Sequence, residues 1–227
     1  MEEIAEKFAS ESDADVDALL ERWDGRPDLL AEDILRAKNL ETDEIEPLTL
    51  FRPYQPRIMH AYFYGGSKIL NIYKGRRIGY SFVYCVAFLL EGMFIPNSFY
   101  PFVARKYGQA ENRISDLQNL ISNAKVDIPT EKNNNGEVVF WNGSKYKAFS
   151  ANPDAERGDD SARAVMLDEM AFMEDQKAVS RAFGAFLALG NNRKMVQVST
   201  PNVANDLFMQ THKRGSPTGK DENGDRI

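Results

Sequence analysis

Residues 69–81 read Ile-Leu-Asn-Ile-Tyr-Lys-Gly-Arg-Arg-Ile-Gly-Tyr-Ser, and this stretch decides the fold. The apolar run at 69–73 predicts a strand, and the strongly apolar run at 81–90 predicts a helix. A basic, glycine-bearing loop joins them, in the setting where backbone N–H groups and a helix N-terminus bind phosphate. We therefore predict a phosphate-binding loop composed of Lys74, Gly75, Arg76, Arg77, Gly79, Tyr80 and Ser81.

One position of this loop departs from the general pattern. Tyr80 stands where phosphate loops usually carry a lysine, directly before the hydroxyl residue Ser81. The Ser81 hydroxyl is placed to bind Mg²⁺, as the hydroxyl residue of such loops does. The alternative is a plain basic turn between a strand and a helix.

A second candidate site follows another apolar strand. Residues 164–167 are apolar, and Asp168 and Glu169 come directly after them, about 90 residues beyond the loop. The carboxyl ends of parallel strands meet at one edge of a sheet, so these carboxylates are expected beside the phosphate loop. Asp168 is predicted to hold Mg²⁺, and Glu169 to orient and activate the attacking water. An apolar strand that ends in Asp-Glu by chance is the alternative.

A third segment repeats this arrangement. The strand pattern Val196-Gln197-Val198 precedes Ser199-Thr200-Pro201-Asn202. Hydroxyls, a proline and an amide therefore follow this strand, and Thr200 and Asn202 are candidate site residues. The alternative is a simple strand-to-helix turn, with Asn202 as the N-cap.

The remaining pattern from residue 53 onward alternates strands and helices. We predict helices at 56–64, 109–121 and 175–189, and strands at 99–104, 137–141, 145–150 and 194–199. Asn142-Gly143 predicts a hairpin between two of these strands. The order predicts an α/β sheet with helices on both faces and one antiparallel hairpin added.

The first 46 residues differ in charge from the rest of the chain. They hold 16 acidic and 5 basic residues, a net charge of −11, whereas residues 47–227 carry a net charge of +5. A nucleic-acid partner for the second part is therefore compatible with the low overall pI. Residues 14–23 and 27–38 have helical patterns, and residues 42–47 are interpreted as a linker.

Composition limits the other possibilities. Cys85 is the single cysteine, which excludes an intrachain disulfide, and only His60 and His212 are available to a Cys/His metal cluster. The longest apolar run, 82–95, is shorter than the roughly 20 residues that cross a bilayer. No apolar segment follows the first residues, so we expect no signal peptide and an intracellular protein.

Together, the three segments resemble the ATPase part of viral DNA-packaging terminase large subunits. The loop resembles the bacteriophage lambda type, Lys-x-x-Arg-x-Gly-Tyr-Ser, with the lysine moved to the loop start at Lys74. In that comparison Thr200 and Asn202 fall in the motif that couples hydrolysis to motion. The resemblance implies that Thr200 or Asn202 senses the γ-phosphate through a hydrogen bond and relays its loss. The segment 51–55 resembles the adenine-recognising segment, with Gln55 as the base reader, and Arg157 resembles an arginine finger.

The resemblance implies an additional-strand, RecA-like P-loop NTPase that binds ATP and Mg²⁺. The catalytic residues it implies are Glu169, Lys74, Arg77 and Arg157. The partners it implies are double-stranded DNA, a portal protein, a small terminase subunit and other copies in a ring, in the host-cell cytoplasm and without a membrane.

We divide the chain into an acidic helical segment at 1–46, the ATPase domain at 47–213 and a tail or linker at 214–227. Terminases generally continue into a nuclease, and we expect no nuclease activity from the residues present here. Two other functions remain open at this point. One is a helicase-like DNA translocase, and the other is a nucleotide-binding assembly module that does not hydrolyse ATP.

Overall fold

A computed structural model describes the chain except for residues 13–14, 40, 52, 153–160, 189–191 and 216–227. Its centre is a seven-stranded sheet within the described residues, in the order β3-β9-β8-β4-β7-β6-β5. The strands are β3 (Ile69–Tyr73), β4 (Phe99–Ala104), β5 (Thr130–Asn134), β6 (Glu137–Phe140), β7 (Lys145–Ser150), β8 (Ala164–Asp168) and β9 (Lys194–Ser199). The first five in sheet order are parallel, whereas β6 and β5 are antiparallel additions at one edge.

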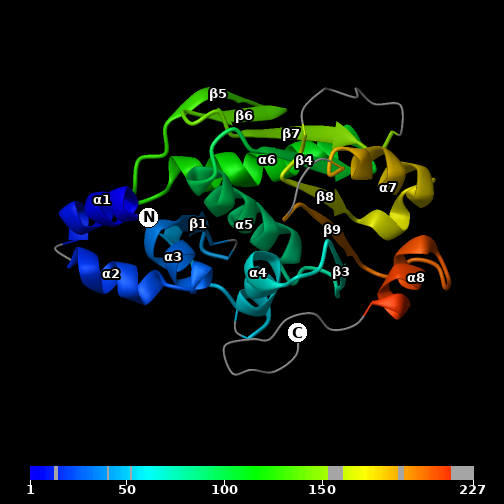
Figure 1. Cartoon of the computed structure of the whole chain (residues 1–227), viewed down its shortest axis with the longest axis horizontal. Coiled ribbons are helices and arrows are strands. Elements are labelled where there is room, and N and C mark those ends of the chain that lie inside the picture. Colours follow the sequence, from blue (N-terminus) through cyan, green and yellow to red (C-terminus); the bar gives the residue numbers. More distant parts are fainter. Residues whose placement is uncertain (13–14, 40, 52, 153–160, 189–191, 216–227) are drawn as a thin grey trace.

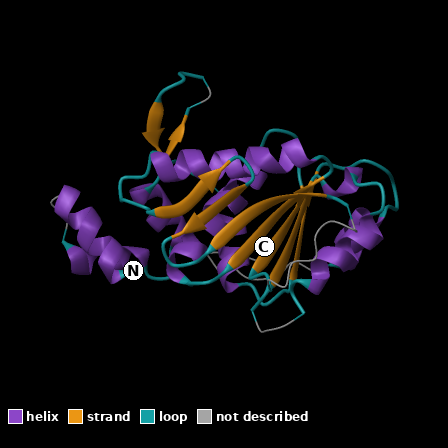
Figure 2. Cartoon of the chain, turned by 90° about the horizontal axis from the view of Figure 1, so that it is seen from above, coloured by secondary structure: helices purple, strands orange, loops and turns teal. Residues whose placement is uncertain are grey.

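Helices cover both faces of this sheet (Figures 1 and 2). The side chains of β4 alternate between two hydrophobic cores, because successive residues of a strand point to opposite faces. Tyr100 and Phe102 pack in the core with α4 (Tyr54–Tyr64), α5 (Tyr80–Phe94) and α6 (Tyr107–Ser122). Phe99 and Val103 pack in the core with η1 (Met170–Phe172), α7 (Gln176–Ala185) and α8 (Leu207–Arg214). The predicted α/β architecture is therefore confirmed.

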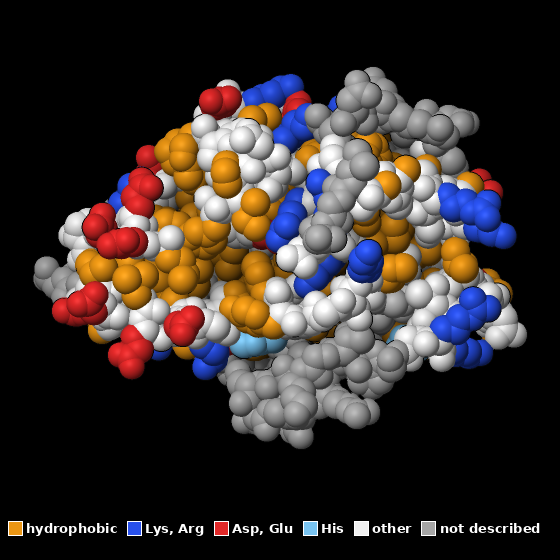
Figure 3. Space-filling model, in the orientation of Figure 1, with side chains coloured by type: hydrophobic (Ala, Val, Ile, Leu, Met, Phe, Trp, Pro, Cys, Tyr) orange, Lys and Arg blue, Asp and Glu red, His pale blue; other side chains and the backbone are white. Residues whose placement is uncertain are grey.

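The amino-terminal residues pack against the first of these cores. They form α1 (Glu2–Ser12), α2 (Val16–Trp23), α3 (Pro27–Ile34) and a two-stranded sheet of β1 (Arg36–Lys38) and β2 (Ile45–Pro47). Trp23 and Ile34 are almost fully buried there. In the view of Figure 3, acidic side chains gather over the end of the molecule that holds α1 and α2, and basic ones lie mainly elsewhere.

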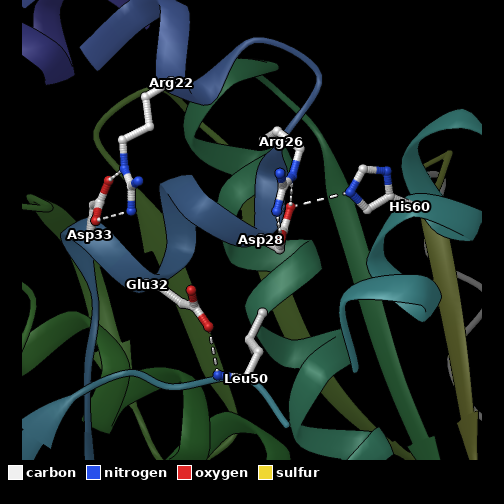
Figure 4. Close-up of polar contacts among 7 residues, drawn as sticks. All are labelled: Arg22, Arg26, Asp28, Glu32, Asp33, Leu50 and His60. Atoms are coloured by element: carbon white, nitrogen blue, oxygen red, sulfur yellow. Dashed lines mark hydrogen bonds and ion pairs between the residues drawn. The ribbon is translucent and has the colours of Figure 1, made fainter. Parts of the chain in front are cut away.

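Polar contacts join this amino-terminal segment to α4 and to the residues just before it (Figure 4). Asp28 is fully buried, and its carboxylate accepts hydrogen bonds from Arg26 at 2.7 and 3.0 Å. His60 of α4 lies 3.2 Å from the same carboxylate. Glu32 accepts a hydrogen bond of 2.9 Å from the Leu50 backbone N–H. A buried carboxylate with several partners therefore joins α3 to α4.

Two predictions in this segment were wrong. The helix predicted at 27–38 ends at Ile34, and residues 36–38 form β1. The stretch 42–47, predicted as a linker, contains β2, which pairs with β1 in antiparallel register. Leu35 is extended and fully buried, and its carbonyl accepts from the Leu48 N–H at 3.0 Å. Tertiary pairing therefore overrides the helical pattern there.

Other differences concern elements without a strong apolar pattern. The helices α1 and α8 and the polar strand β5 were not predicted. The helix predicted at 175–189 ends at Ala185, and the last residue of that prediction lies outside the described part of the chain. The hairpin of β6 and β7 is confirmed, with Gly143 in a left-handed conformation at φ 79°. None of the helices in the described residues combines the length and apolarity that a bilayer crossing needs.

Candidate nucleotide-binding and catalytic site

The loop between β3 and α5 has an unusual backbone and leads directly into a helix. Arg77 and Gly79 both have positive φ values, 61° and 74°, and left-handed residues of this kind occur in backbone turns that bind anions. Gly79 is the N-cap of α5, and no side chain caps that helix end. The first N–H groups of α5 therefore face the loop with the positive end of the helix dipole.

A side chain at position 79 would also collide with its surroundings. A Cβ atom there would lie 2.7 Å from Nε2 of Gln55, in addition to the cost of a left-handed conformation. Gln55 is buried, its Nε2 donates to the Ile78 carbonyl at 3.2 Å, and its Oε1 accepts from the Phe51 N–H at 3.0 Å. The predicted adenine reader thus lies against the phosphate loop and holds its backbone.

Lys74 leaves β3 and reaches across the carboxyl edge of the sheet. Its backbone N–H donates to the Ser199 carbonyl of β9 at 3.0 Å. Its side chain is 9% exposed, and Nζ lies 2.6 Å from Oε1 of Glu169. A lysine and a glutamate 95 residues apart in the sequence therefore meet in one ion pair.

Glu169 connects two of the predicted motifs. It follows β8 in a left-handed conformation, with φ 52° and ψ 45°. Its Oε2 accepts three hydrogen bonds of 3.2 Å, from the Ser199 hydroxyl, the Thr200 hydroxyl and the Thr200 N–H. Burial opposes ionisation, but Lys74 and these donors leave the pKa of Glu169 below its ordinary value. Glu169 is therefore held as a carboxylate between the loop and the segment after β9.

Asp168 has a different environment. Its Oδ1 accepts from the Ser81 hydroxyl at 2.7 Å, which brings together the two predicted Mg²⁺ ligands. Arg113 of α6 approaches the other oxygen, with Nε 3.8 Å from Oδ2. Burial raises the pKa of Asp168 above its ordinary value, although Arg113 and Ser81 act in the opposite direction.

A cavity of about 410 Å³ opens beside these groups. It is lined by Lys74, Arg76, Arg77, Arg105, Gln109, Glu169, Phe172 and Thr200. Gly75, Arg76 and Arg77 are exposed, and Tyr80 is half-buried at the start of α5. Sequence reasoning missed Arg105, Gln109 and Arg113. These residues belong to no recognisable sequence motif. They reach the site because β4 pairs with β8 and α6 begins shortly after β4 ends.

The remaining predicted residues differ in what the structure describes. Asn202 is exposed, and its Nδ2 donates to the Ala171 carbonyl at 3.0 Å. The alternative role of Asn202 as an N-cap is wrong, because Asp206 caps α8 through a hydrogen bond of 2.7 Å from Met209 N. Arg157 lies outside the described residues.

The sequence matches a family model described as terminase large subunit, T4likevirus-type, N-terminal, over residues 71–213. That region is more than half of the 227 residues. The chain belongs to the terminase large-subunit family. No curated protein sequence matches it.

Solved structures agree with the terminase fold. The large terminase ATPase domain of Thermus phage P74-26 is 18% identical, with a TM-score of 0.53, and covers 79% of this chain and 74% of that one. The large terminase of bacteriophage HK97 is 17% identical, with a TM-score of 0.64, and the match covers 82% of this chain and 40% of that one. The predicted terminase ATPase domain, an ATP hydrolase of the viral packaging machinery, is therefore confirmed at the level of the family, and neither alternative function gains support over it.

Proposed function

We propose that this terminase domain binds ATP in the cavity beside Lys74 and hydrolyses it to move double-stranded DNA into a procapsid. The observation that supports this most directly is the contact of Glu169 with both Lys74, at 2.6 Å, and Thr200, at 3.2 Å. One carboxylate then connects the phosphate loop to the predicted coupling segment. A change at the phosphates would therefore reach the segment that follows β9.

Lys74 supplies the cation that Tyr80 cannot supply. The transition state of phosphoryl transfer carries charge at the β–γ bridge, where a positioned cation stabilises it. Lys74 Nζ already lies among the groups that line the cavity, and its flexible stem lets it exchange Glu169 for a phosphate oxygen. Arg76 and Arg77 are exposed cations on the same loop and compete for this role.

Glu169 acts as the general base that orients and activates the attacking water. Its lowered pKa keeps it ionised, and the bonds from Ser199 and Thr200 fix its direction. When a phosphate takes Lys74, one oxygen of Glu169 becomes free to accept a proton from water. The other oxygen, Oε2, continues to accept hydrogen bonds from Thr200.

The Mg²⁺ ion of the reaction fits the oxygen donors that the domain offers. Ser81 Oγ and Asp168 Oδ1 are hard ligands 2.7 Å apart at the end of the phosphate loop. Mg²⁺ is commonly bound by one or two protein oxygens together with substrate phosphates and water. The described residues contain no group of three or more His, Cys, Asp or Glu side chains suited to hold a metal alone. Bound Mg²⁺ supplies charge neutralisation to the β- and γ-phosphates.

The remaining predicted residues complete the proposal. Gln55 holds the phosphate loop through Ile78 and reads the adenine edge with its second amide hydrogen. Asn202 relays loss of the γ-phosphate through its bond to Ala171. Arg157 serves as an arginine finger toward the nucleotide of a neighbouring subunit. These roles place the motor in a ring on a portal protein, with a small terminase subunit and DNA as partners, in the host-cell cytoplasm.

The test separates nucleotide binding from hydrolysis. Glu169→Gln should keep ATP affinity and lose phosphate release by at least about 100-fold, the scale of a general base. Glu131→Gln, an exposed change on β5, is the matched control and should leave both unchanged. Turnover by Glu169→Gln at the wild-type rate removes Glu169 from this role.

Phosphate release and strand separation, each measured with double-stranded DNA, distinguish a packaging motor from the two alternative functions. Stimulation by DNA without strand separation supports a packaging motor. Separation of the strands supports a helicase-like translocase. Nucleotide binding with no phosphate release, in any condition, supports an assembly module.

A further inference from the structure

Arg105 lines the proposed nucleotide cavity, and it follows a strand that lies three places from β3 in the sheet. It directly follows β4, whose last residue Ala104 is in register with Asp168 of β8. Its side chain therefore lies beside the end of the strand that carries the catalytic carboxylates, and it lines the cavity together with Lys74 and Glu169. Nothing in the sequence marks it as a site residue.

The sheet order separates Arg105 from the loop cations. Strands β9 and β8 lie between β3, which precedes Lys74, and β4, which precedes Arg105. Neighbouring strands are about 4.8 Å apart, so β3 and β4 are roughly 14 Å apart at this edge. A polyphosphate held by the loop at one end therefore extends toward Arg105 with its other end. That end would carry the γ-phosphate, because the backbone N–H groups of phosphate loops bind the α- and β-phosphates, which lie nearer the nucleoside.

The cavity wall has an excess of positive charge. Among the described residues that line it, Lys74, Arg76, Arg77 and Arg105 are cations, and Glu169 is the single carboxylate. Lys74 already neutralises Glu169 at 2.6 Å. A guanidinium at the far end of the cavity therefore lacks a strong anionic partner within it, and its planar fork suits a terminal phosphate group.

The contact that Arg105 does make is weak and easily exchanged. Its Nη2 lies 3.8 Å from Oε1 of Glu174, with side chains that are 50% and 90% exposed. Exposed ion pairs of this kind contribute little to stability. Glu174 lies between η1 and α7, five residues after Glu169. Movement of Arg105 away from it changes a contact in the segment that joins the catalytic carboxylates to α7.

We propose that Arg105 is a cis-acting ligand of the γ-phosphate and that Glu174 takes it back when that phosphate leaves. Arg105 then distinguishes ATP from ADP, because ADP lacks the phosphate that reaches it. The inference rests on the proposed function, since it requires ATP at this cavity. It adds to the catalytic residues one that distinguishes ATP from ADP within the same subunit.

The experiment compares ATP and ADP affinity in variants that all carry Glu169→Gln, so that ATP survives the measurement. Arg105→Ala should weaken ATP binding by roughly 10- to 100-fold, the scale of hydrogen bonds to a charged group. Its ADP affinity should stay within about threefold of the parent. Arg105→Lys keeps the positive charge but loses the planar guanidinium, so its ATP affinity should lie between those of the parent and Arg105→Ala. Glu174→Gln should raise ATP affinity by at most about threefold, because the exposed pair it removes is weak.

Arg181→Ala, an exposed arginine of α7 away from the cavity, is the control and should change neither affinity. Equal loss of ATP and ADP binding in Arg105→Ala, or no loss of either, overturns the role of Arg105. If Arg105→Ala is poorly folded by circular dichroism, the ratio of ATP to ADP affinity in Arg105→Lys decides the question in its place. Failure of the parent to bind either nucleotide overturns the proposed function, whereas normal parent binding with an unchanged ratio in the variants overturns this inference alone.

Discussion

The two ends of β8 and β9 are built from different kinds of contact. At their carboxyl ends Glu169 and Thr200 face a cavity, and Glu169 is joined to Lys74 by one ion pair. At their amino ends Arg163, which directly precedes β8, and Lys194, the first residue of β9, enter a cluster around the buried Glu91. The same pair of strands therefore has one end open to ligands and one end closed by protein.

The closed end is dense with polar contacts. Arg163 Nε lies 2.9 Å from Oε1 of Glu91, and the Tyr62 hydroxyl donates to Oε2 of the same carboxylate. Burial, with the negative charge of Glu91, raises the pKa of Tyr62 well above its ordinary value, so Tyr62 stays a donor. Lys194 Nζ donates to the carbonyls of Tyr62 and, at 3.1 Å, of Gly65.

The difference between the two ends of β8 and β9 indicates which parts of the molecule can move when a nucleotide binds or leaves. The amino ends are joined to α4 and α5 by these hydrogen bonds, which oppose sliding of the strands as units. The carboxyl ends are held by hydrogen bonds from the ammonium of Lys74 and the hydroxyl of Ser81, two donors that a phosphate can take from Glu169 and Asp168. Motion is therefore expected in the loops after β8 and β9 and not in the strands themselves.

The largest effect is expected from the open end. Lys74→Ala should lower steady-state hydrolysis by at least about 100-fold, because it removes both a phosphate cation and the partner of Glu169. Tyr80→Phe, half-buried at the start of α5, should be mild and serves as the control. Phosphate release should be measured at saturating ATP, with thermal unfolding to show that both variants fold. Retention of most activity by Lys74→Ala together with its loss in Arg77→Ala would assign the role to an arginine.

A smaller effect, on stability instead of activity, is expected from the closed end. Glu91→Gln leaves the guanidinium of Arg163 without its carboxylate, and breaking a buried pair costs about 3–5 kcal/mol. Since the Arg163 side chain is 26% exposed, we expect about 2–3 kcal/mol. The Tm should fall by about 5–10 °C for a chain of this size. The ATP KM of the folded protein should stay within about twofold.

Glu131→Gln on the exposed edge strand is again the matched change and should leave the Tm unaltered. The comparison between the two ends fails if Glu91→Gln abolishes hydrolysis at a temperature where the protein is fully folded. It also fails if Lys74→Ala lowers the Tm as much as Glu91→Gln does.

The sequence predicts the open end better than the closed one. The order of strand, glycine loop and helix at 69–94 is local, and mostly apolar stretches stand on both sides of the loop. The carboxylates at the end of β8 and the hydroxyls at the end of β9 also follow apolar sequence patterns that predict these strands. The contact between Lys74 and Glu169 is not local, and it depends on β9 lying between their strands.

Most of the residues that sequence reasoning missed make contacts with residues that are distant in the sequence. Arg105 and Arg113 reach the site through the register of β4 against β8, which no periodicity reveals. Glu91 interrupts an apolar run, and its partners Arg163 and Lys194 lie 72 or more residues away. The strand β5 is polar, since it lies at an exposed sheet edge, so its sequence lacks the apolar alternation of a half-buried strand.

The smallest expected effect concerns the charge of Lys194 at the closed end. Burial lowers the pKa of Lys194 below that of a free lysine, and Arg163 adds to this, although Glu91 acts in the opposite direction. The unfolded chain therefore holds this proton to a higher pH than the folded protein does. Between the folded pKa and the ordinary value of about 10.4, folding releases the proton, so stability rises with pH.

Urea denaturation of wild type and Lys194→Met between pH 7 and pH 10 measures this contribution. The free energy of unfolding of wild type, minus that of the variant, should increase toward alkaline pH with a slope below about 1.4 kcal/mol per pH unit, the limit for one proton. Tyrosines and other lysines titrate in both proteins, and their contributions cancel in the difference. The neutral amine still donates to the carbonyls of Tyr62 and Gly65, so loss of the charge does not break the cluster. A difference that stays flat or declines over this range would mean that Glu91 outweighs burial and that Lys194 is held at the closed end as a cation.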